Sequence, residues 1–171
     1  CNGWRKAGDS IWLISSYFNK NEVDEYITLS ATSYLEVIHG LITGRPPKTN
    51  LESEFLLQIF LRESINKKHV LSAHDVSDGG LAVSLAECCI SGNLGATIDL
   101  PESTDRIDKI LFAEGGGRIL ISISPERILA WESFLNDFNN KNNHLITANP
   151  IGKVNKNKDL IINQIEKKYI N

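Results

Sequence analysis

The chain contains 171 residues, 42% of them hydrophobic and 23% charged, which is enough for a globular protein with its own hydrophobic core. The formal net charge of −3 argues against a basic surface for nucleic acid, and no apolar run approaches the roughly 18–20 residues that cross a membrane. No secretory signal opens the chain and its three cysteines suggest no disulfide framework, so we expect a cytoplasmic protein.

The first half of the chain shows the hydrophobic periodicity of two strands and two helices. The run Gly44-Arg45-Pro46-Pro47 cannot continue a helix, and Asn50 is a good N-cap because Glu52 and Glu54 follow it in the first turn. The predicted elements are a strand over Ser10–Ser15, a helix over Ser33–Leu41, a helix from Asn50 to about Lys67, and a strand over Val70–Ala73.

The second half continues this irregular alternation. The predicted elements are a helix over Leu81–Ile90, a strand over Ala96–Leu100, a helix over Asp105–Phe112, a strand over Arg118–Ser124, a helix from Pro125-Glu126 through Leu135, a polar loop over Asn139–Asn143, and strands over His144–Val154 and Leu160–Ile162. This order predicts one layered α+β domain, with helices packed on a mixed sheet.

The most informative segment is His74-Asp75-Val76-Ser77-Asp78-Gly79-Gly80-Leu81, between a predicted strand and a predicted helix. Its carboxylates are suitable ligands for a divalent cation, and its glycine N–H groups can approach phosphate at the positive end of the helix. The alternative is that Ser77 or Asp78 only caps the helix and that the glycines only make the turn.

A second segment, Glu114-Gly115-Gly116-Gly117, precedes a predicted strand. Consecutive glycines lose much conformational entropy on folding, so they are usually kept for close approach or for positive φ. The segment predicts either a carboxylate beside a backbone cradle for a polar ligand or a flexible turn.

Cys1 raises a separate possibility. An N-terminal cysteine can be an autoprocessed nucleophile, as in a glutaminase or another amidohydrolase. The long helix predicted after Asn50 argues against the β-rich fold that such amidohydrolases need.

The segment from Ala73 to Glu87 closely resembles a motif in the C-terminal part of phosphoribosylformylglycinamidine synthase, a ligase family of purine biosynthesis related to aminoimidazole ribonucleotide synthetase. Three further segments match that family in the same order, so the similarity covers nearly the whole chain. They are Ser33-Tyr34-Leu35 with His39-Gly40, then Gly44-Arg45-Pro46-Pro47, and Leu111-Phe112 with Glu114 and Gly117-Arg118.

The resemblance implies a protein of two similar halves, each with its own C-terminal domain. Residues 1–171 would be the single C-terminal domain of the second half, cut from a longer multidomain enzyme, which agrees with the absence of methionine. The resemblance also implies a largely antiparallel sheet. In the family, ATP activates the amide oxygen of formylglycinamide ribonucleotide, and ammonia from a glutaminase then displaces phosphate. The implied cofactors are ATP and Mg²⁺. The implied partners are the rest of the polypeptide, a glutaminase subunit and, in some assemblies, a small accessory subunit.

Individual roles follow from the matching motifs. Asp75 resembles the aspartate that reaches a nucleotide-bound Mg²⁺, Ser77 resembles a residue that contacts the nucleotide, and Gly79 and Gly80 belong to the same cofactor-binding loop. Glu114 aligns with a substrate-contacting position, although two glycines replace the Ser-Gln that follow it in the family. No catalytic residue carries over, so we expect the chain alone to be inactive.

Two alternatives remain. The chain resembles, less well, the C-terminal domains of selenophosphate synthetase, thiamine monophosphate kinase and a hydrogenase-maturation protein, and it is also compatible with a non-catalytic interaction domain. In either case we expect an exposed apolar face formed by Trp12, Tyr34, Leu35 and the strand around Ile119–Ile123, because these side chains exceed what the modest helices can cover.

Overall fold

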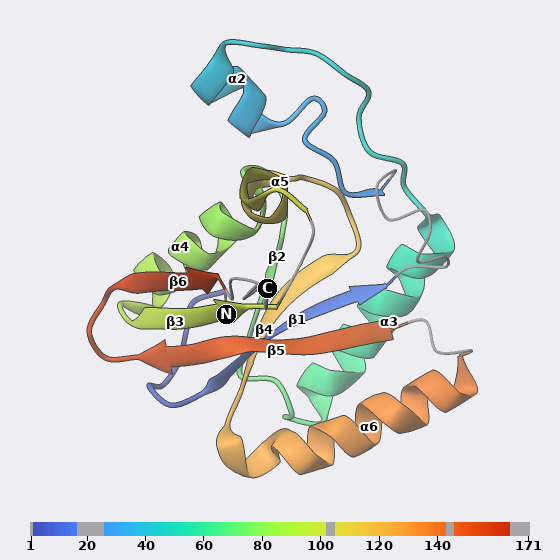
Figure 1. The fold of residues 1–171 in the computed structure, drawn as a ribbon. Helices are drawn as coiled ribbons and strands as arrows, with labels where there is room; N and C mark the ends of the chain where they lie inside the picture. Colours follow the sequence, from blue (N-terminus) through green and yellow to red (C-terminus); the bar gives the residue numbers. More distant parts are fainter. Residues whose placement is uncertain (1, 17–25, 102–104, 143–145, 165–171) are drawn as a thin grey trace, which may run out of the picture.

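The computed structural model describes residues 2–16, 26–101, 105–142 and 146–164, in which helices pack on a six-stranded sheet (Figure 1). The strands are β1 (Ser10–Ser16), β2 (Ser72–Asp75), β3 (Gly95–Leu100), β4 (Arg118–Ile123), β5 (Ile146–Asn155) and β6 (Leu160–Gln164). The helices are α2 (Ser33–His39), α3 (Leu51–Asn66), α4 (Gly80–Gly92), α5 (Ile107–Phe112) and α6 (Ile128–Lys141). Cys1 and His144 lie outside the described residues.

The sheet has the strand order β2-β4-β1-β5-β3-β6. Four of its five strand pairs are antiparallel, and only β3 and β6 run parallel. The pairing of β1 with β5 shifts between Ile11 and Trp12, because Ile151 is an extra residue in β5. The layered α+β fold with a mixed, largely antiparallel sheet is therefore confirmed.

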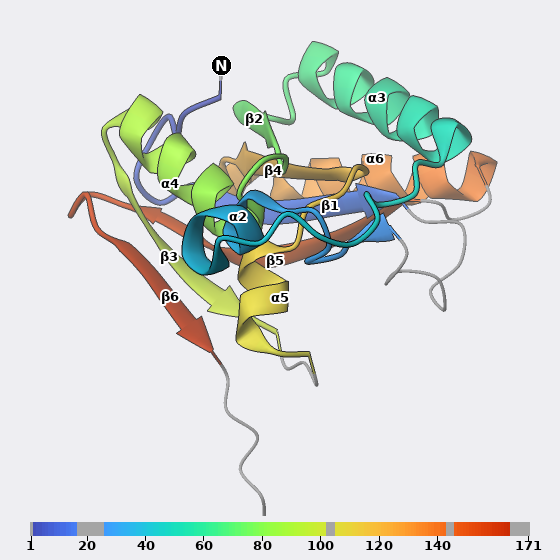
Figure 2. The ribbon, with the colours of Figure 1, turned by 90° about the horizontal axis from the view of Figure 1, so that it is seen from above.

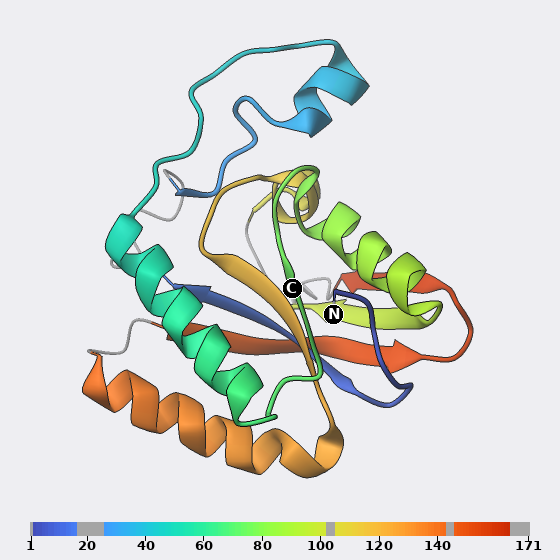
Figure 3. The same cartoon turned by 180° about the vertical axis from the view of Figure 1, so that it is seen from behind.

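Alternate residues of the central strands face two separate cores. Ile11 and Leu120 pack with α4, whereas Trp12, Ile14 and Ile121 pack with α3 and α6. Successive side chains of a strand point to opposite faces, so α4 covers one face of the sheet and α3 with α6 covers the other. Figures 2 and 3 agree, since β2 runs between α4 and α3 in both views.

Local capping explains where α2 and α3 begin and end. Asn50 Oδ1 accepts hydrogen bonds of 3.1 Å from the N–H groups of both Glu52 and Ser53, which confirms the predicted cap. The helix α2 ends at His39 rather than Leu41, because Gly40 takes the left-handed conformation with φ +64° and its N–H closes onto the last turn.

Two other predicted boundaries were wrong. The strand expected over Val70–Ala73 lies two residues later, since the ladder with β4 pairs Ser72 with Ser122 and Asp75 with Ile119. The predicted loop from Asn139 is instead the last turn of α6 as far as Lys141. The Asn139 side chain holds that turn by exchanging two hydrogen bonds with the main chain of Ile146, at 2.7 and 3.0 Å.

The predicted apolar face is largely covered. Trp12 is only 6% exposed, whereas Tyr34 and Leu35 are half-buried, with the Tyr34 ring stacked on Phe112 at 4.7 Å. The most exposed apolar side chains near this region instead follow Tyr34, on α2 and just after it: Val37, Ile38, Leu41 and Ile42. Within the described ranges, no helix is long and apolar enough to cross a bilayer.

The adjacent cysteines of α4 are buried and reduced, as expected for packing residues. Burial raises the pKa of the Cys88 thiol to about 12, so it stays protonated. Cys89 accepts a hydrogen bond of 3.3 Å from the Trp4 indole N–H. Both cysteine side chains therefore pack in the hydrophobic core between α4 and the sheet.

Asp9 is 1% exposed, and neither of its carboxyl oxygens has a partner within hydrogen-bond distance in the described residues. Burial raises its pKa, and interactions with Lys6 offset only part of that effect. The folded state thus holds the Asp9 proton more tightly than the unfolded state does. Stability is expected to fall as the pH rises from the ordinary aspartate pKa of 3.8 through the raised value.

Asp9→Asn should therefore raise the free energy of unfolding at pH 7.5, by about 1 kcal/mol, and change it little near pH 3.5. Urea unfolding at both pH values measures this. The exposed Asp159→Asn serves as the control and should change stability at neither pH. Equal effects of Asp9→Asn at the two pH values would contradict the expectation.

Candidate functional site

The two segments singled out in the sequence meet at one cleft of about 470 Å³. Residues 75–78 form one wall after β2, and residues 114–119 form another as the chain enters β4. The first half of α3 contributes Glu54, Leu57 and Gln58, and Pro47 lies at the rim. Segments about 40 residues apart in the chain thus build a common site, which neither segment predicts alone.

The Asp75–Gly80 loop presents polar groups outward. The Asp75 side chain is 77% exposed, and Ser77 and Asp78 are also exposed beside the cleft. Neither Ser77 nor Asp78 caps α4, since the N-cap is Gly79 and no side chain makes the usual capping hydrogen bond. The capping alternative is therefore wrong, and these side chains remain available to a ligand.

The N–H groups of the two glycines in this loop are both used within the protein. Gly79 N donates to Glu114 Oε1 at 2.8 Å, and Gly80 N donates to the Ser77 carbonyl at 3.0 Å. The expectation that they lie free to meet a phosphate is thus not met in this conformation. Both glycines have positive φ, +78° and +68°, and shape the loop that presents Ser77.

His74 contacts the main chain of Asp75. Its side chain is 11% exposed, its Nδ1 lies 2.6 Å from the Asp75 carbonyl oxygen, and its Nε2 lies 3.2 Å from Glu87 Oε2. Ser84 Oγ donates to the same carbonyl at 3.2 Å. These contacts hold the main chain of Asp75, and His74 Nδ1 also lies 4.0 Å from Asp75 Oδ1.

Glu114 joins separate parts of the structure. Its Oε1 accepts hydrogen bonds from Gly79 N at 2.8 Å and from Ser33 N at 2.9 Å. Its main chain exchanges two hydrogen bonds of 3.0 Å with Thr28. The predicted substrate residue is therefore half-buried at the junction of two loops, on the wall of the cleft.

Close packing requires a glycine directly after Glu114. Gly115 has φ +149°, and a Cβ there would lie 1.9 Å from the Tyr26 carbonyl oxygen. A Cβ on Gly116 would lie 2.4 Å from Glu54 Oε1, but this atom is the end of a flexible side chain that can move. Main-chain contact therefore explains Gly115, and it argues against a flexible turn at that position.

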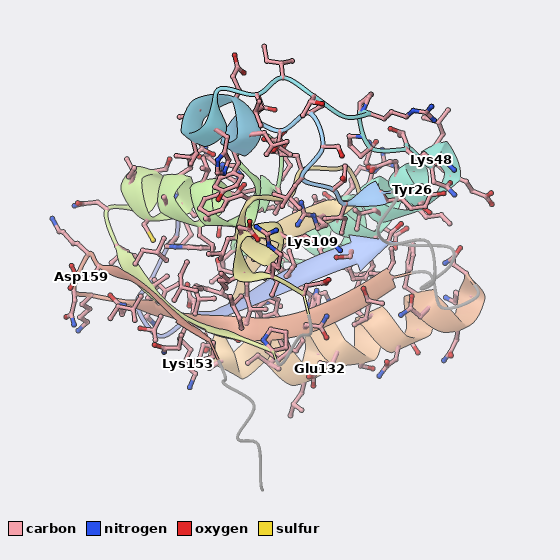
Figure 4. The ribbon with its side chains drawn as sticks, turned by 45° about the horizontal axis from the view of Figure 1, so that its top comes forward. Tyr26, Lys48, Lys109, Glu132, Lys153 and Asp159 are labelled. Carbon is pink, nitrogen blue, oxygen red and sulfur yellow. The ribbon has the colours of Figure 1, made fainter. Side chains whose placement is uncertain are left out.

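Glu54 is a cleft residue that the sequence analysis assigned only to the first turn of a helix. Burial raises the pKa of its carboxyl group, and a hydrogen bond from the Gly117 main chain partly offsets the rise. Tyr26 and Lys48 line a narrow pocket with Glu54, and Figure 4 shows both near the start of α3. The signal was present in the spacing, since Glu54 lies three residues before the fully buried Leu57 on the same side of the helix.

The cleft carries four carboxylates: Glu54, Asp75, Asp78 and Glu114. Even so, no group of three or more His, Cys, Asp or Glu side chains in the described part of the chain could hold a metal ion by itself. Mg²⁺ is usually held by one or two carboxylates together with substrate phosphates and water. The exposed Asp75 carboxylate fits a cation that arrives with a nucleotide better than a permanent protein-only metal site.

The chain is similar to known proteins over most of its length. Residues 6–163 match the family model of AIR synthase related protein, C-terminal domain. The chain is 49% identical over 169 residues to phosphoribosylformylglycinamidine synthase subunit PurL from Prochlorococcus marinus strain SARG, covering 98% of this chain and 21% of that protein. The chain thus spans about a fifth of the length of the curated relatives that it matches.

Solved structures agree on the fold. Thermotoga maritima PurL complexed with FGAR superposes with a TM-score of 0.67 at 17% identity, covering 96% of this chain and 26% of that one. The same protein complexed with ATP gives a TM-score of 0.63 at 17% identity, covering 96% and 24%. A HypE–HypF complex gives 0.60 at 20% identity, covering 96% and 52%. The chain therefore belongs to the AIR synthase related protein family and represents its C-terminal domain.

Proposed function

We propose that this chain is the C-terminal domain of the second half of a phosphoribosylformylglycinamidine synthase, an ATP-dependent ligase that converts formylglycinamide ribonucleotide and glutamine-derived ammonia to the amidine. The observation that carries the proposal is the meeting of the Asp75–Gly80 loop and the Glu114–Gly117 segment at one cleft. The 49% identity to a PurL subunit supports the choice of reaction.

Within this proposal, Asp75 contributes one anionic oxygen to a nucleotide-bound Mg²⁺, and Ser77 contacts the nucleotide. Gly79 and Gly80 shape the loop that carries both residues, and Glu114 faces the substrate side of the cleft. The cation neutralises phosphate charge when it is bound. Without it, a cleft with this many carboxylates would repel a nucleotide. The ATP complex of Thermotoga maritima PurL supports this assignment of cofactor.

The remaining parts of the reaction belong to other chains or domains in this proposal. The relatives are named as a subunit of the synthase, and one solved structure with this fold is described as PurLQS from Thermotoga maritima. We propose that this domain works with the rest of its own polypeptide, with a glutaminase subunit and, in some assemblies, with a small accessory subunit. The reaction would take place in the cytoplasm.

Two alternatives are less well supported. The fold likeness to HypE–HypF and to a thiamine-monophosphate kinase, at 20% and 16% identity, concerns the fold only. A non-catalytic interaction domain would not require exposed Asp75 and Ser77 side chains in a cleft, or a second acidic segment that lines the same cleft.

The proposal predicts that Asp75→Asn weakens binding of Mg²⁺–ATP by about 10–100-fold in the intact polypeptide, because it removes an anionic oxygen while preserving shape. Calorimetric titration with Mg²⁺–ATP measures the affinity. Asp159→Asn, far from the cleft, is the matched control (Figure 4) and should bind like the wild type.

Wild-type affinity in Asp75→Asn would reject the metal role of this residue. The reaction itself is tested separately, by amidine formation from formylglycinamide ribonucleotide, ATP and ammonia in the intact polypeptide. Absence of that activity in the wild type and in the Asp159→Asn control would reject the proposed ligase.

A further inference from the structure

One carboxylate serves the first turns of two helices that are far apart in the chain. Gly79 is the N-cap of α4, and Ser33 is the first residue of α2. The N–H groups of both residues donate to the same atom, Glu114 Oε1, at 2.8 and 2.9 Å. Glu114 lies 35 residues from Gly79 and 81 residues from Ser33 in the sequence.

We infer that Glu114 is a positioning residue: it fixes the Asp75–Gly80 loop relative to the α2 arm, which we define as residues 26–49. The inference rests on hydrogen-bond geometry. Its consequence for nucleotide binding rests in addition on the proposed function, so the two are tested by different measurements.

The electrostatics favour this role. The first turn of a helix exposes N–H groups and a partial positive charge, and a carboxylate placed there is stabilising. The α4 N-terminus has no capping side chain of its own, since Ser77 and Asp78 do not supply one. Glu114 provides that negative charge from another part of the chain.

The packing around Glu114 leaves it little freedom. Its main chain is paired with Thr28, and the Gly115 that follows lies against Tyr26. On the other side of the junction, the Tyr34 ring of the arm stacks on Phe112 at 4.7 Å. The main chain of Glu114 is therefore held in place, and its carboxylate can position both the loop and the arm.

The arm in turn borders the cleft. It leaves the junction at α2, continues through the extended segment seen above the sheet in Figure 1, and reaches the cleft rim at Pro47. The arm is linked to the Asp75–Gly80 loop by hydrogen bonds through Glu114. A second link is packing, since Tyr34 stacks on Phe112 and Gly80 lies against the main chain around Phe112. Glu114 is hydrogen-bonded to both of these elements, and both contribute residues to the same cleft.

Three substitutions distinguish the reach of the Glu114 side chain from its negative charge. Glu114→Gln keeps an oxygen acceptor at the same reach and removes the charge. Glu114→Asp keeps the charge and is too short by one methylene to reach both N–H groups. Glu114→Ala removes both properties. The exposed Glu52→Ala, on the first turn of α3, is the control.

The measurement is hydrogen–deuterium exchange by mass spectrometry in the intact polypeptide, on peptides that cover residues 28–36 and 76–84. With Glu114→Ala and Glu114→Asp, exchange in both peptides should accelerate by about tenfold or more, because a hydrogen bond to a charged acceptor is lost in each. With Glu114→Gln, exchange in both peptides should rise by less than with Glu114→Asp, because a neutral oxygen still accepts both hydrogen bonds but no longer carries the charge. With Glu52→Ala, both peptides should exchange at nearly the wild-type rate. Protection of β4 monitors the global fold.

The inference is overturned if Glu114→Asp behaves like the wild type while Glu114→Gln does not, because charge alone would then explain the residue. It is also overturned if the two peptides respond independently. Titration with Mg²⁺–ATP is the second measurement: Glu114→Asp should lose about tenfold in affinity through displacement of Asp75 and Ser77, and Glu114→Gln should lose less. If wild-type protein does not bind Mg²⁺–ATP, the proposed function fails, and the exchange result still decides the positioning role.

Discussion

Replacing Gly80 with alanine should lower the free energy of unfolding by about 2–4 kcal/mol and also disturb the cleft. Gly80 has φ +68°, a conformation that an L-residue adopts at a cost of about 1–2 kcal/mol. In addition, a Cβ at this position would lie 2.8 Å from the carbonyl oxygens of Leu111 and Ala113. These are main-chain atoms, so the loop rather than a flexible side chain must move.

The matched control is Gly40→Ala. Gly40, the C-cap of α2, also has positive φ, +64°, but no described atom lies within 4 Å of the position its Cβ would take. Gly40→Ala therefore measures the conformational cost alone, and the excess in Gly80→Ala measures the contact with the main chain before β4. Urea unfolding gives both values. Equal losses for the two variants would show that the close contact contributes nothing.

The same comparison has a functional readout. The loop displaced by Gly80→Ala carries Ser77 and Asp75, so the affinity for Mg²⁺–ATP should fall in this variant and remain unchanged in Gly40→Ala. If Gly80→Ala were less stable but bound Mg²⁺–ATP normally, the position of the loop would not matter for nucleotide binding. That outcome would argue against the proposed nucleotide role of the loop.

The elements that could be predicted from the sequence are those controlled by nearby residues. Asn50 caps α3 through N–H groups two and three residues away, so composition alone identifies it. The same holds for the strands that alternate between two cores, such as β1. Strand β2 was misplaced by two residues because its limits depend on the ladder with β4, which lies more than 40 residues later in the chain.

The candidate site shows the same division. Asp75, Ser77 and Glu114 were identified from local patterns, and the structure brings all three to one cleft. Local patterns could not show that Glu114, rather than Ser77 or Asp78, supplies the negative charge at α4, since that contact spans 35 residues. Glu54 was missed for a related reason: its neighbourhood is formed by Gly116 and Gly117 from another segment.

Trp131→Ala should give the largest loss of stability, about 3–5 kcal/mol of a total that is typically 5–15 kcal/mol. Trp131 is fully buried and packs edge-on against Trp12 of β1, with ring centroids 4.8 Å apart, and against Phe60 of α3 at 6.2 Å. Removing the indole leaves a cavity at the point where the sheet, α3 and α6 meet. The neighbours are aromatic rings on separate elements and can fill such a space only partly.

Trp131→Phe is the control for this substitution. It keeps an aromatic ring in the cavity and removes an indole N–H that has no hydrogen-bond partner among the described residues. The free energy of unfolding should therefore fall by less in Trp131→Phe, by about 1–2 kcal/mol. Because Glu54 and Leu57 line the cleft from the same helix as Phe60, Trp131→Ala should also loosen that wall. Hydrogen exchange in α3 should then rise more than in α4, which packs on the other core. Equal acceleration in the two helices would show that the sheet does not separate the two cores energetically.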